Sequence, residues 1–280
     1  MTRPRVLVTG GSMGIGRAVA EELASHGVEL LLVARGADAL EETRAALPGE
    51  GHETHALDVS DERAWAALAP RLEHLDGLVT AAAVLDPVGP VGSYEPSEFR
   101  RTVEINLFGT LLAIHHCLPA LRAARGAVVT FSGGGATAPL PRYDAYAASK
   151  AAVVRLTENL ASELAGDGIR VNAVAPGFVA TRIHETTLGA GPEAAGADYF
   201  ARTERDLAEG GVPPSEAAEL VRVLLDPEAA PFSGKLLSAQ WDSWRESDFR
   251  ARLAAEPDLA TLRRIDDVLF ATAPATTKQP

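Results

Sequence analysis

Two side chains that together could move a proton, Tyr146 and Lys150, stand four residues apart in a stretch with helical periodicity over about 143–165. Residues four apart lie on one face of a helix, so the phenol and the ammonium group would be neighbours. A free phenol has a pKa of about 10, and lowering it by about 3 units needs roughly 4 kcal/mol of preference for the phenolate. A nearby positive charge can supply part of that preference. Tyr146 would then exchange a proton with an alcohol or a carbonyl, unless the two residues form an ordinary surface pair.

A second group of residues could bind phosphate. The segment 5–16 reads RVLVTGGSMGIG, in which β-favouring residues run into glycines and a helical pattern follows. Gly10 permits a tight turn, Gly14 lets the backbone approach a pyrophosphate, and Gly16 lets the helix pack closely on the sheet. The N–H groups at the start of that helix attract anions. An ordinary strand-to-helix turn remains the alternative.

The elements that must position these residues alternate along the chain. Short apolar runs, typical of strands that are buried on both faces, alternate with segments that have helical spacing. This alternation predicts a doubly wound parallel sheet with helices on both faces. Expected strands cover about 5–9, 28–34, 52–57, 78–81, 127–131, 169–174 and 235–238. Expected helices start at about 14, 37, 61, 96, 143 and 215, the last with Ser215 as its N-cap, and residues 182–214 form a polar, partly helical lid.

The composition excludes several classes of function. The 280 residues carry a net charge of −12, which disfavours nucleic-acid binding. The single cysteine, Cys117, rules out an internal disulfide, and its neighbours His115 and His116 point different ways on a helix, so no metal site is expected. We expect no signal peptide and no apolar run close to a membrane span, and hence a cytoplasmic protein that does not bind membranes.

Taken together, the glycine turn and the Tyr146–Lys150 pair resemble the short-chain dehydrogenase/reductase family, over nearly all of residues 5–240. The resemblance implies a Rossmann-like α/β fold in a single domain, 1–240, which binds a dinucleotide and catalyses hydride transfer. Tyr146 would be the acid/base, Lys150 would lower its pKa together with an oxidised nicotinamide, and Asn106 would anchor a proton relay. Cofactor contacts are implied for Gly10, Ser12, Gly14, Ile15, Gly16, Arg35, Asp58, Val59, Tyr146, Lys150, Pro176, Gly177, Val179 and Thr181. The resemblance also suggests a homodimer or homotetramer formed through the two long helices.

The choice of cofactor depends on the end of the second expected strand. Family members that use NAD usually carry an acidic residue there, whereas this chain has Ala34 followed by Arg35. A guanidinium suits a 2′-phosphate, so NADP is favoured over NAD. If Arg35 only stacks on adenine, NAD remains possible.

Two departures from the family pattern stand out. The segment N-N-A-G after the fourth strand is replaced by Thr80-Ala81-Ala82-Ala83, which removes the asparagine that braces the sheet. The catalytic serine, most often thirteen residues before the tyrosine, would fall on Gly133, and Ser132 stands one position early. Either Ser132 binds the substrate oxygen, or backbone N–H groups of 133–135 replace it.

The expected reaction interconverts a secondary alcohol and a ketone on a small polar substrate by hydride transfer. The alternatives are an epimerase that retains its cofactor and a cofactor-binding protein with little catalysis. Polar lid residues hint at a polar or cationic substrate, although a solvated helix face explains them equally well; they are His184, Glu185, Glu193, Asp198 and Glu204. Tyr143 lacks a lysine partner. Trp241, Trp244 and Phe249 belong to a C-terminal extension, 241–280, which either covers a neighbouring subunit or the mouth of the site or packs on its own subunit; its last residues, from about 270, are expected to be frayed.

Overall fold

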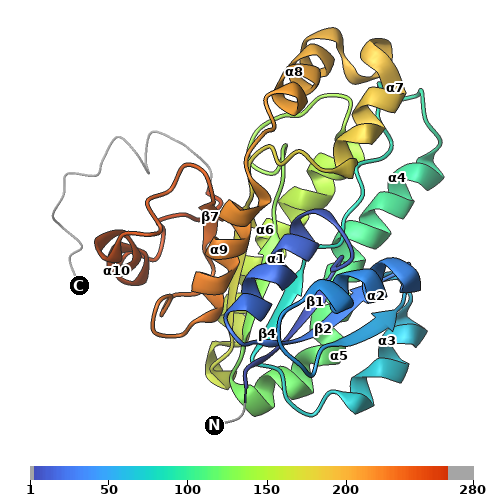
Figure 1. The fold of residues 1–280 in the computed structure, drawn as a ribbon. Helices are drawn as coiled ribbons and strands as arrows, with labels where there is room; N and C mark the ends of the chain where they lie inside the picture. Colours follow the sequence, from blue (N-terminus) through green and yellow to red (C-terminus); the bar gives the residue numbers. More distant parts are fainter. Residues whose placement is uncertain (1–2, 264–280) are drawn as a thin grey trace, which may run out of the picture.

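Seven parallel strands form one sheet in the computed structural model, which describes residues 3–263 (Figure 1). Their order is β3-β2-β1-β4-β5-β6-β7, so the chain winds outward from β1 in one direction and from β4 in the other. The predicted α/β fold with a doubly wound parallel sheet is confirmed. The crevice of such sheets lies at the carboxyl ends of the strands, where the winding reverses. The strands are β1 (Arg5–Thr9), β2 (Glu29–Ala34), β3 (Glu53–Ala56), β4 (Gly77–Thr80), β5 (Ala127–Phe131), β6 (Arg170–Ala175) and β7 (Leu236–Ser238).

Helices cover both faces of the sheet because successive strand residues point to opposite sides. In β1, Val6 and Val8 join one buried cluster and Leu7 joins another. The first cluster packs under α1 (Gly14–Ser25), α2 (Ala37–Ala46) and α9 (Pro214–Leu225). The second packs under α3 (Glu62–Leu68), α5 (Gly109–Ala124) and α6 (Asp144–Glu163).

The expected lid is largely helical. A 3₁₀ turn, Arg182–His184, leads into α7 (Glu185–Ala195), and α8 (Ala197–Ala208) follows at once. The two helices lie together at one end of the molecule, apart from the helices that cover the sheet (Figure 1). The next helix begins at Pro214, with Pro213 as its N-cap, so the prediction that Ser215 caps it is wrong. The fixed φ of proline suits the first helical position, which explains the earlier start.

One long helical segment, Pro96–Ala124, joins α4 (Pro96–Val103), a π-helical turn (Glu104–Phe108) and α5. It is long and apolar enough to span a membrane by length and composition, the only such helix within residues 3–263, so the expectation that no apolar run comes close is wrong. Ile105, Ile114 and Leu121 on this segment are buried in the second cluster, under the sheet. A core helix of a soluble protein meets the same criterion.

The described part of the C-terminal extension packs on its own subunit. The ring of Trp244 is buried, its Nε1 donates to the carbonyl of Ala239 at 2.9 Å, and Phe249 packs against the same first cluster. α10 (Ser247–Ala255) lies at the β7 edge of the sheet (Figure 1). Trp241 is 79% exposed and lines the cleft at the carboxyl ends of the strands, so this part of the extension also reaches the expected site. The expected fraying from about residue 270 lies outside the described residues.

Replacing Lys235 with Met should detach the end of this extension. Lys235 is buried, and its Nζ donates to the carbonyls of Glu256, Pro257 and Leu259 at 2.7, 2.9 and 2.8 Å. Methionine leaves these acceptors without a donor, so we expect the free energy of unfolding in urea to fall by about 2 kcal/mol. Arg252→Ala is the matched control, because its ion pair with Glu256 is exposed and should contribute less than about 0.5 kcal/mol. If the Lys235 variant is as stable as the wild type, these three hydrogen bonds do not hold the extension in place.

Candidate active site

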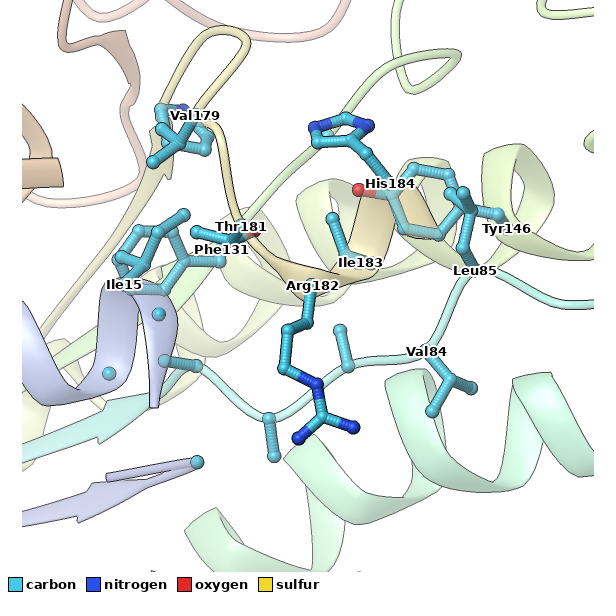
Figure 2. Close-up of a pocket in the computed structure, with 18 of the residues that line it drawn as sticks. Ile15, Val84, Leu85, Phe131, Tyr146, Val179, Thr181, Arg182, Ile183 and His184 are labelled. Atoms are coloured by element: carbon cyan, nitrogen blue, oxygen red, sulfur yellow. The ribbon is translucent and has the colours of Figure 1, made fainter. Parts of the chain in front are cut away.

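A cleft of about 1230 Å³ opens at the carboxyl ends of the strands and beneath the lid. Figure 2 shows part of it, with Tyr146, Phe131 and the lid residues 181–184 around the cavity. Of the predicted site residues, only Asn106 does not line it. The lining includes Gly10, Ser12, Gly14, Ile15, Gly16, Arg35, Asp58, Val59, Ser132, Tyr146, Lys150, Pro176, Gly177, Val179 and Thr181.

The glycine turn has the shape of a phosphate cradle. Gly10 has a φ of +70° and Gly14 one of +54°, values that disfavour other residues. A Cβ at Gly16 would lie 2.3 Å from the carbonyl oxygen of Gly10, so only glycine lets α1 approach the turn this closely. The first turn of α1 carries no acidic residue, which leaves its N–H groups and positive end facing the cleft. These features fit the pyrophosphate of a dinucleotide.

Two oppositely charged side chains, Arg35 and Asp58, also line the cleft. The Arg35 side chain is exposed just after β2 and has no ion-pair partner among residues 3–263. Asp58 accepts hydrogen bonds from the Ser60 backbone and hydroxyl at 3.0 and 2.7 Å and from Arg101 Nη2 at 2.6 Å. Burial raises the pKa of Asp58, but these donors outweigh it and the net pKa is lowered. Asp58 is therefore a fixed anion, and Arg101, which no sequence signal singled out, holds it.

The Tyr146–Lys150 pair lies inside the cleft on α6, as its spacing predicted. Lys150 Nζ donates to the carbonyl of Phe131 at 3.0 Å and lies 5.8 Å from the centre of the Tyr146 ring. Burial lowers the pKa of Lys150 to about 8. Burial, followed by the nearby Tyr199, raises the pKa of Tyr146. Without a bound cofactor, burial therefore keeps the phenol protonated, and the expected lowering of its pKa by Lys150 together with an oxidised nicotinamide stays a prediction.

The missing serine has a steric explanation. A Cβ placed on Gly133 would lie 2.2 Å from the Tyr146 hydroxyl oxygen, so the phenol occupies the space of any side chain at this position. The neighbouring Ser132 is buried, lines the cleft, and its backbone N–H donates to the carbonyl of Val174 at 2.9 Å. No protein partner of its hydroxyl occurs within residues 3–263, which leaves that group available to a ligand.

Asn106 lies behind the cleft. Its side-chain amide exchanges two hydrogen bonds with the backbone of Val84, both 2.9 Å long, and donates to Ser149 Oγ at 3.0 Å. Ser149 in turn donates to the carbonyl of Tyr146 at 2.8 Å. Asn106 therefore positions the start of α6 relative to the segment after β4. Its role in a proton relay stays a prediction.

The segment that lacks the family's bracing asparagine is held in another way. The backbone N–H of Ala82 donates to Thr9 Oγ1 at 3.2 Å, and a Cβ at Gly10 would lie 3.0 Å from Ala82. Two residues later, Asn106 holds both backbone groups of Val84. The segment is thus tied to β1 at one end and to the π-helical turn at the other.

An apolar wall beside Tyr146 escaped the sequence analysis. Leu85, Leu140, Ile183 and Tyr199 line the cleft and pack with Tyr146 in one cluster. Tyr143 is buried beneath it, where its hydroxyl donates to Thr187 Oγ1 at 3.1 Å and ties α6 to the lid. No sequence signal could have revealed this wall, because its residues come from four separate segments.

Two of the five polar lid residues singled out from the sequence line the cleft, as do the lid residues Arg202 and Asp206. His184 and Glu185 line it, whereas the side chains of Glu193, Asp198 and Glu204 are exposed and lie outside it. The His184 ring stacks on Phe178 with its centre 4.0 Å away. Within residues 3–263, no group of three or more His, Cys, Asp and Glu side chains could hold a metal ion.

Because of Lys150, the folded protein should gain stability between pH 7 and pH 9. The unfolded chain keeps the Lys150 proton up to its usual pKa of 10.5, whereas the folded chain releases it near pH 8. Rising pH therefore favours the folded state in this window, by about 1 kcal/mol. The measurement is urea unfolding at pH 7, 8 and 9 for the wild type and for Lys150→Met, in which the gain should be absent. Parallel pH profiles for the two proteins would contradict the lowered pKa.

Comparison with known proteins places these features in a family. A family model for short chain dehydrogenases matches residues 4–189. The chain is 36% identical over 192 residues to a levodione reductase of Leifsonia aquatica, which covers 65% of this chain and 72% of that protein. It is 38% identical over 184 residues to a cis-4-hydroxycyclohexanecarboxylate dehydrogenase of Sinomonas cyclohexanicum, covering 62% of this chain and 73% of the relative.

Solved structures agree. The crystal structure of a levodione reductase superimposes with a TM-score of 0.76 at 31% identity, covering 85% of this chain and 96% of the other. An actinorhodin polyketide ketoreductase with NADPH superimposes with a TM-score of 0.73 at 30% identity, covering 84% and 95%. With its fold, its glycine turn and its matched sequence, the chain belongs to the short-chain dehydrogenase/reductase family and is an oxidoreductase of the NAD(P)-dependent type.

Proposed function

We propose that this enzyme interconverts a secondary alcohol and a ketone with NADP(H) as its cofactor. The observation that carries the proposal is that one cleft is lined by Tyr146, Lys150, the glycine turn and Arg35. When bound, the cofactor supplies or accepts the hydride. The chain's own groups bind it, orient the substrate and move the proton.

In the reducing direction, Tyr146 would donate its hydroxyl proton to the oxygen of the substrate as the carbonyl carbon is reduced. The raised pKa suits this step, because the phenol is protonated at neutral pH. Ser132 Oγ would donate a hydrogen bond to the same oxygen, and Lys150, held by the Phe131 carbonyl, would bind the nicotinamide ribose. In the oxidising direction, Tyr146 must lose its proton, and the charge of an oxidised nicotinamide would then offset its burial.

We propose a substrate whose reacting carbon belongs to a hydrocarbon ring. The apolar wall made by Leu85, Leu140, Ile183 and Tyr199 supports this, and three of the acidic lid residues that suggested a polar substrate face away from the cleft. The name of one relative, the cis-4-hydroxycyclohexanecarboxylate dehydrogenase, also refers to a six-membered carbon ring that bears a hydroxyl group. The test is NADPH oxidation, followed at 340 nm, with cyclic ketones and matched open-chain polar ketones. NADPH binding without consumption by either group would contradict the proposed reaction.

Arg35→Ala should remove the preference for NADP(H). Because its guanidinium is the cation that follows β2, we expect the Kd for NADPH to rise about tenfold or more, while the Kd for NADH changes by less than about twofold. Equilibrium fluorescence of the reduced cofactors gives both values. Arg44→Ala is the control, since Arg44 pairs with Glu41 on the outer face of α2. If the Arg35 variant binds NADPH and NADH more weakly by the same factor, Arg35 does not recognise the 2′-phosphate.

We further propose a homo-oligomer formed through α5 and α6. Phe108 and Leu111, at the start of α5, are 50% and 36% exposed, which is unusual for side chains of this size on a helix that otherwise packs on the sheet. A cytoplasmic location, with a small molecule as partner and no membrane or nucleic acid, remains part of this proposal.

A further inference from the structure

The first lid residue after Thr181 places a second guanidinium in the cleft. Arg182 lies in the 3₁₀ turn that leads into α7, and Figure 2 shows its side chain extending from the lid backbone across the cavity. Its Nη1 lies 3.9 Å from the Met13 sulfur, and Met13 is the N-cap of α1. Thr181 lies 3.3 Å from the place that a Cβ of Gly14 would take. Residues 181–182 therefore lie directly opposite the phosphate-binding turn.

Positive charge prevails in this arrangement. The start of α1 bears a partial positive charge, and its first turn contains no acidic residue to balance it. Arg182 brings a full positive charge to the same place. Within residues 3–263 its ion-pair partner is Glu185 at 3.6 Å, and the two side chains are 70% and 68% exposed, so this pair contributes little. Two positive ends that face each other across a cleft favour an anion between them.

We propose that Arg182 binds the pyrophosphate of the cofactor from the lid, on the side opposite the glycine turn. This inference rests on the proposed function, because it needs a dinucleotide in the cleft. The phosphate oxygens would then accept hydrogen bonds from the N–H groups of α1 on one side and from the guanidinium on the other. A guanidinium can bind two phosphate oxygens at once, which an ammonium cannot do. Arg182 and Arg35 thus have separate tasks, since only Arg35 would distinguish NADP(H) from NAD(H).

The experiment measures cofactor binding and, separately, the KM for a ketone. Kd values for NADPH and NADH are obtained from cofactor fluorescence, and those for NADP⁺ from calorimetry, with the wild type, Arg182→Ala, Arg182→Lys and Arg202→Ala. In the alanine variant we expect the Kd values for NADPH and NADH to rise by the same factor, about tenfold to a hundredfold. In the lysine variant both Kd values should rise by a smaller factor. Adenosine 2′-phosphate lacks the pyrophosphate, so its affinity should not change in Arg182→Ala.

Arg202→Ala is the matched control. Arg202 also lines the cleft from the lid and is 67% exposed, but it pairs with Asp206 on α8. Its loss removes the same charge and should leave the Kd of all four ligands unchanged. Arg182 is exposed, so Arg182→Ala without cofactor should melt at the wild-type temperature, while saturating NADPH should raise the melting temperature of the variant by less.

The outcomes are distinct. Three results would overturn the role of Arg182 and leave the proposed function standing. They are wild-type Kd values in Arg182→Ala, weaker binding of NADPH alone in that variant, and equally weakened binding in the Arg202 control. Unchanged cofactor Kd with a higher KM for the ketone would show that Arg182 binds the substrate instead. If the wild type binds neither dinucleotide, the proposed function itself fails, and the role of Arg182 fails with it.

Discussion

Tyr146→Phe should lower kcat for ketone reduction by about 10²- to 10⁴-fold while the Kd for NADPH stays within about twofold of the wild type. The substitution removes the hydroxyl that faces Gly133 and keeps the ring that packs with Leu85 and Tyr199. The reducing step then has no proton donor at the oxygen of the substrate, whereas the cleft keeps its shape. Steady-state kinetics with a saturating ketone and fluorescence titration with NADPH measure the two effects.

Tyr143→Phe is the matched control for this variant. Tyr143 lies three residues earlier, is buried, and donates to Thr187 rather than lining the cleft. Its loss should lower the free energy of unfolding by about 1 kcal/mol and leave kcat close to that of the wild type. If Tyr146→Phe turns over at the wild-type rate, or if both variants lose the same activity, Tyr146 is not the proton donor.

Gly133→Ala should lower kcat by about 10²-fold without weakening the binding of NADPH. The added Cβ would lie 2.2 Å from the Tyr146 hydroxyl oxygen and 2.9 Å from the ring carbon that bears it, so the phenol must move by about 1 Å or more. A shift of this size at a reacting group commonly costs two orders of magnitude in rate. The glycine turn, Arg35 and Lys150 are unaffected, which separates this effect from cofactor binding.

Gly134→Ala provides the comparison. A Cβ at Gly134 meets only the Leu140 side chain, at 3.4 Å, an ordinary contact. We therefore expect kcat within about twofold of the wild type for this variant. Wild-type activity in Gly133→Ala would mean that Tyr146 works from a position other than the one against Gly133. A crystal structure of the variant would show where the phenol has gone.

Features set by neighbours along the chain could be predicted from the sequence. The alternation of apolar strands with helical spacing established the doubly wound sheet, because a parallel sheet with helices on both faces buries every strand. The turn from Gly10 to Gly16 and the i, i+4 pair of Tyr146 and Lys150 are likewise local, and both line the same cleft. The family resemblance on these residues agrees with the matched family model.

The sequence could not predict the burial and the surroundings of individual side chains. The sequence placed Lys150 beside Tyr146 but could not show that burial lowers the pKa of the lysine and raises that of the tyrosine. The sequence could not show which acidic lid residues reach the cleft: Glu185 lines it, whereas Glu193, Asp198 and Glu204 are exposed outside it.

The sequence by itself determined the succession of strands and helices along the chain, the glycine turn and the Tyr–Lys pair, because backbone preferences and side-chain periodicity act over a few residues. The tertiary structure alone decided that Gly133 makes room for the Tyr146 hydroxyl, that Asn106 and Thr9 brace the segment after β4, and that Arg182 faces the start of α1. Each of these contacts joins segments at least thirteen residues apart in the chain, and the packing of the whole sheet, not any local pattern, sets their distances.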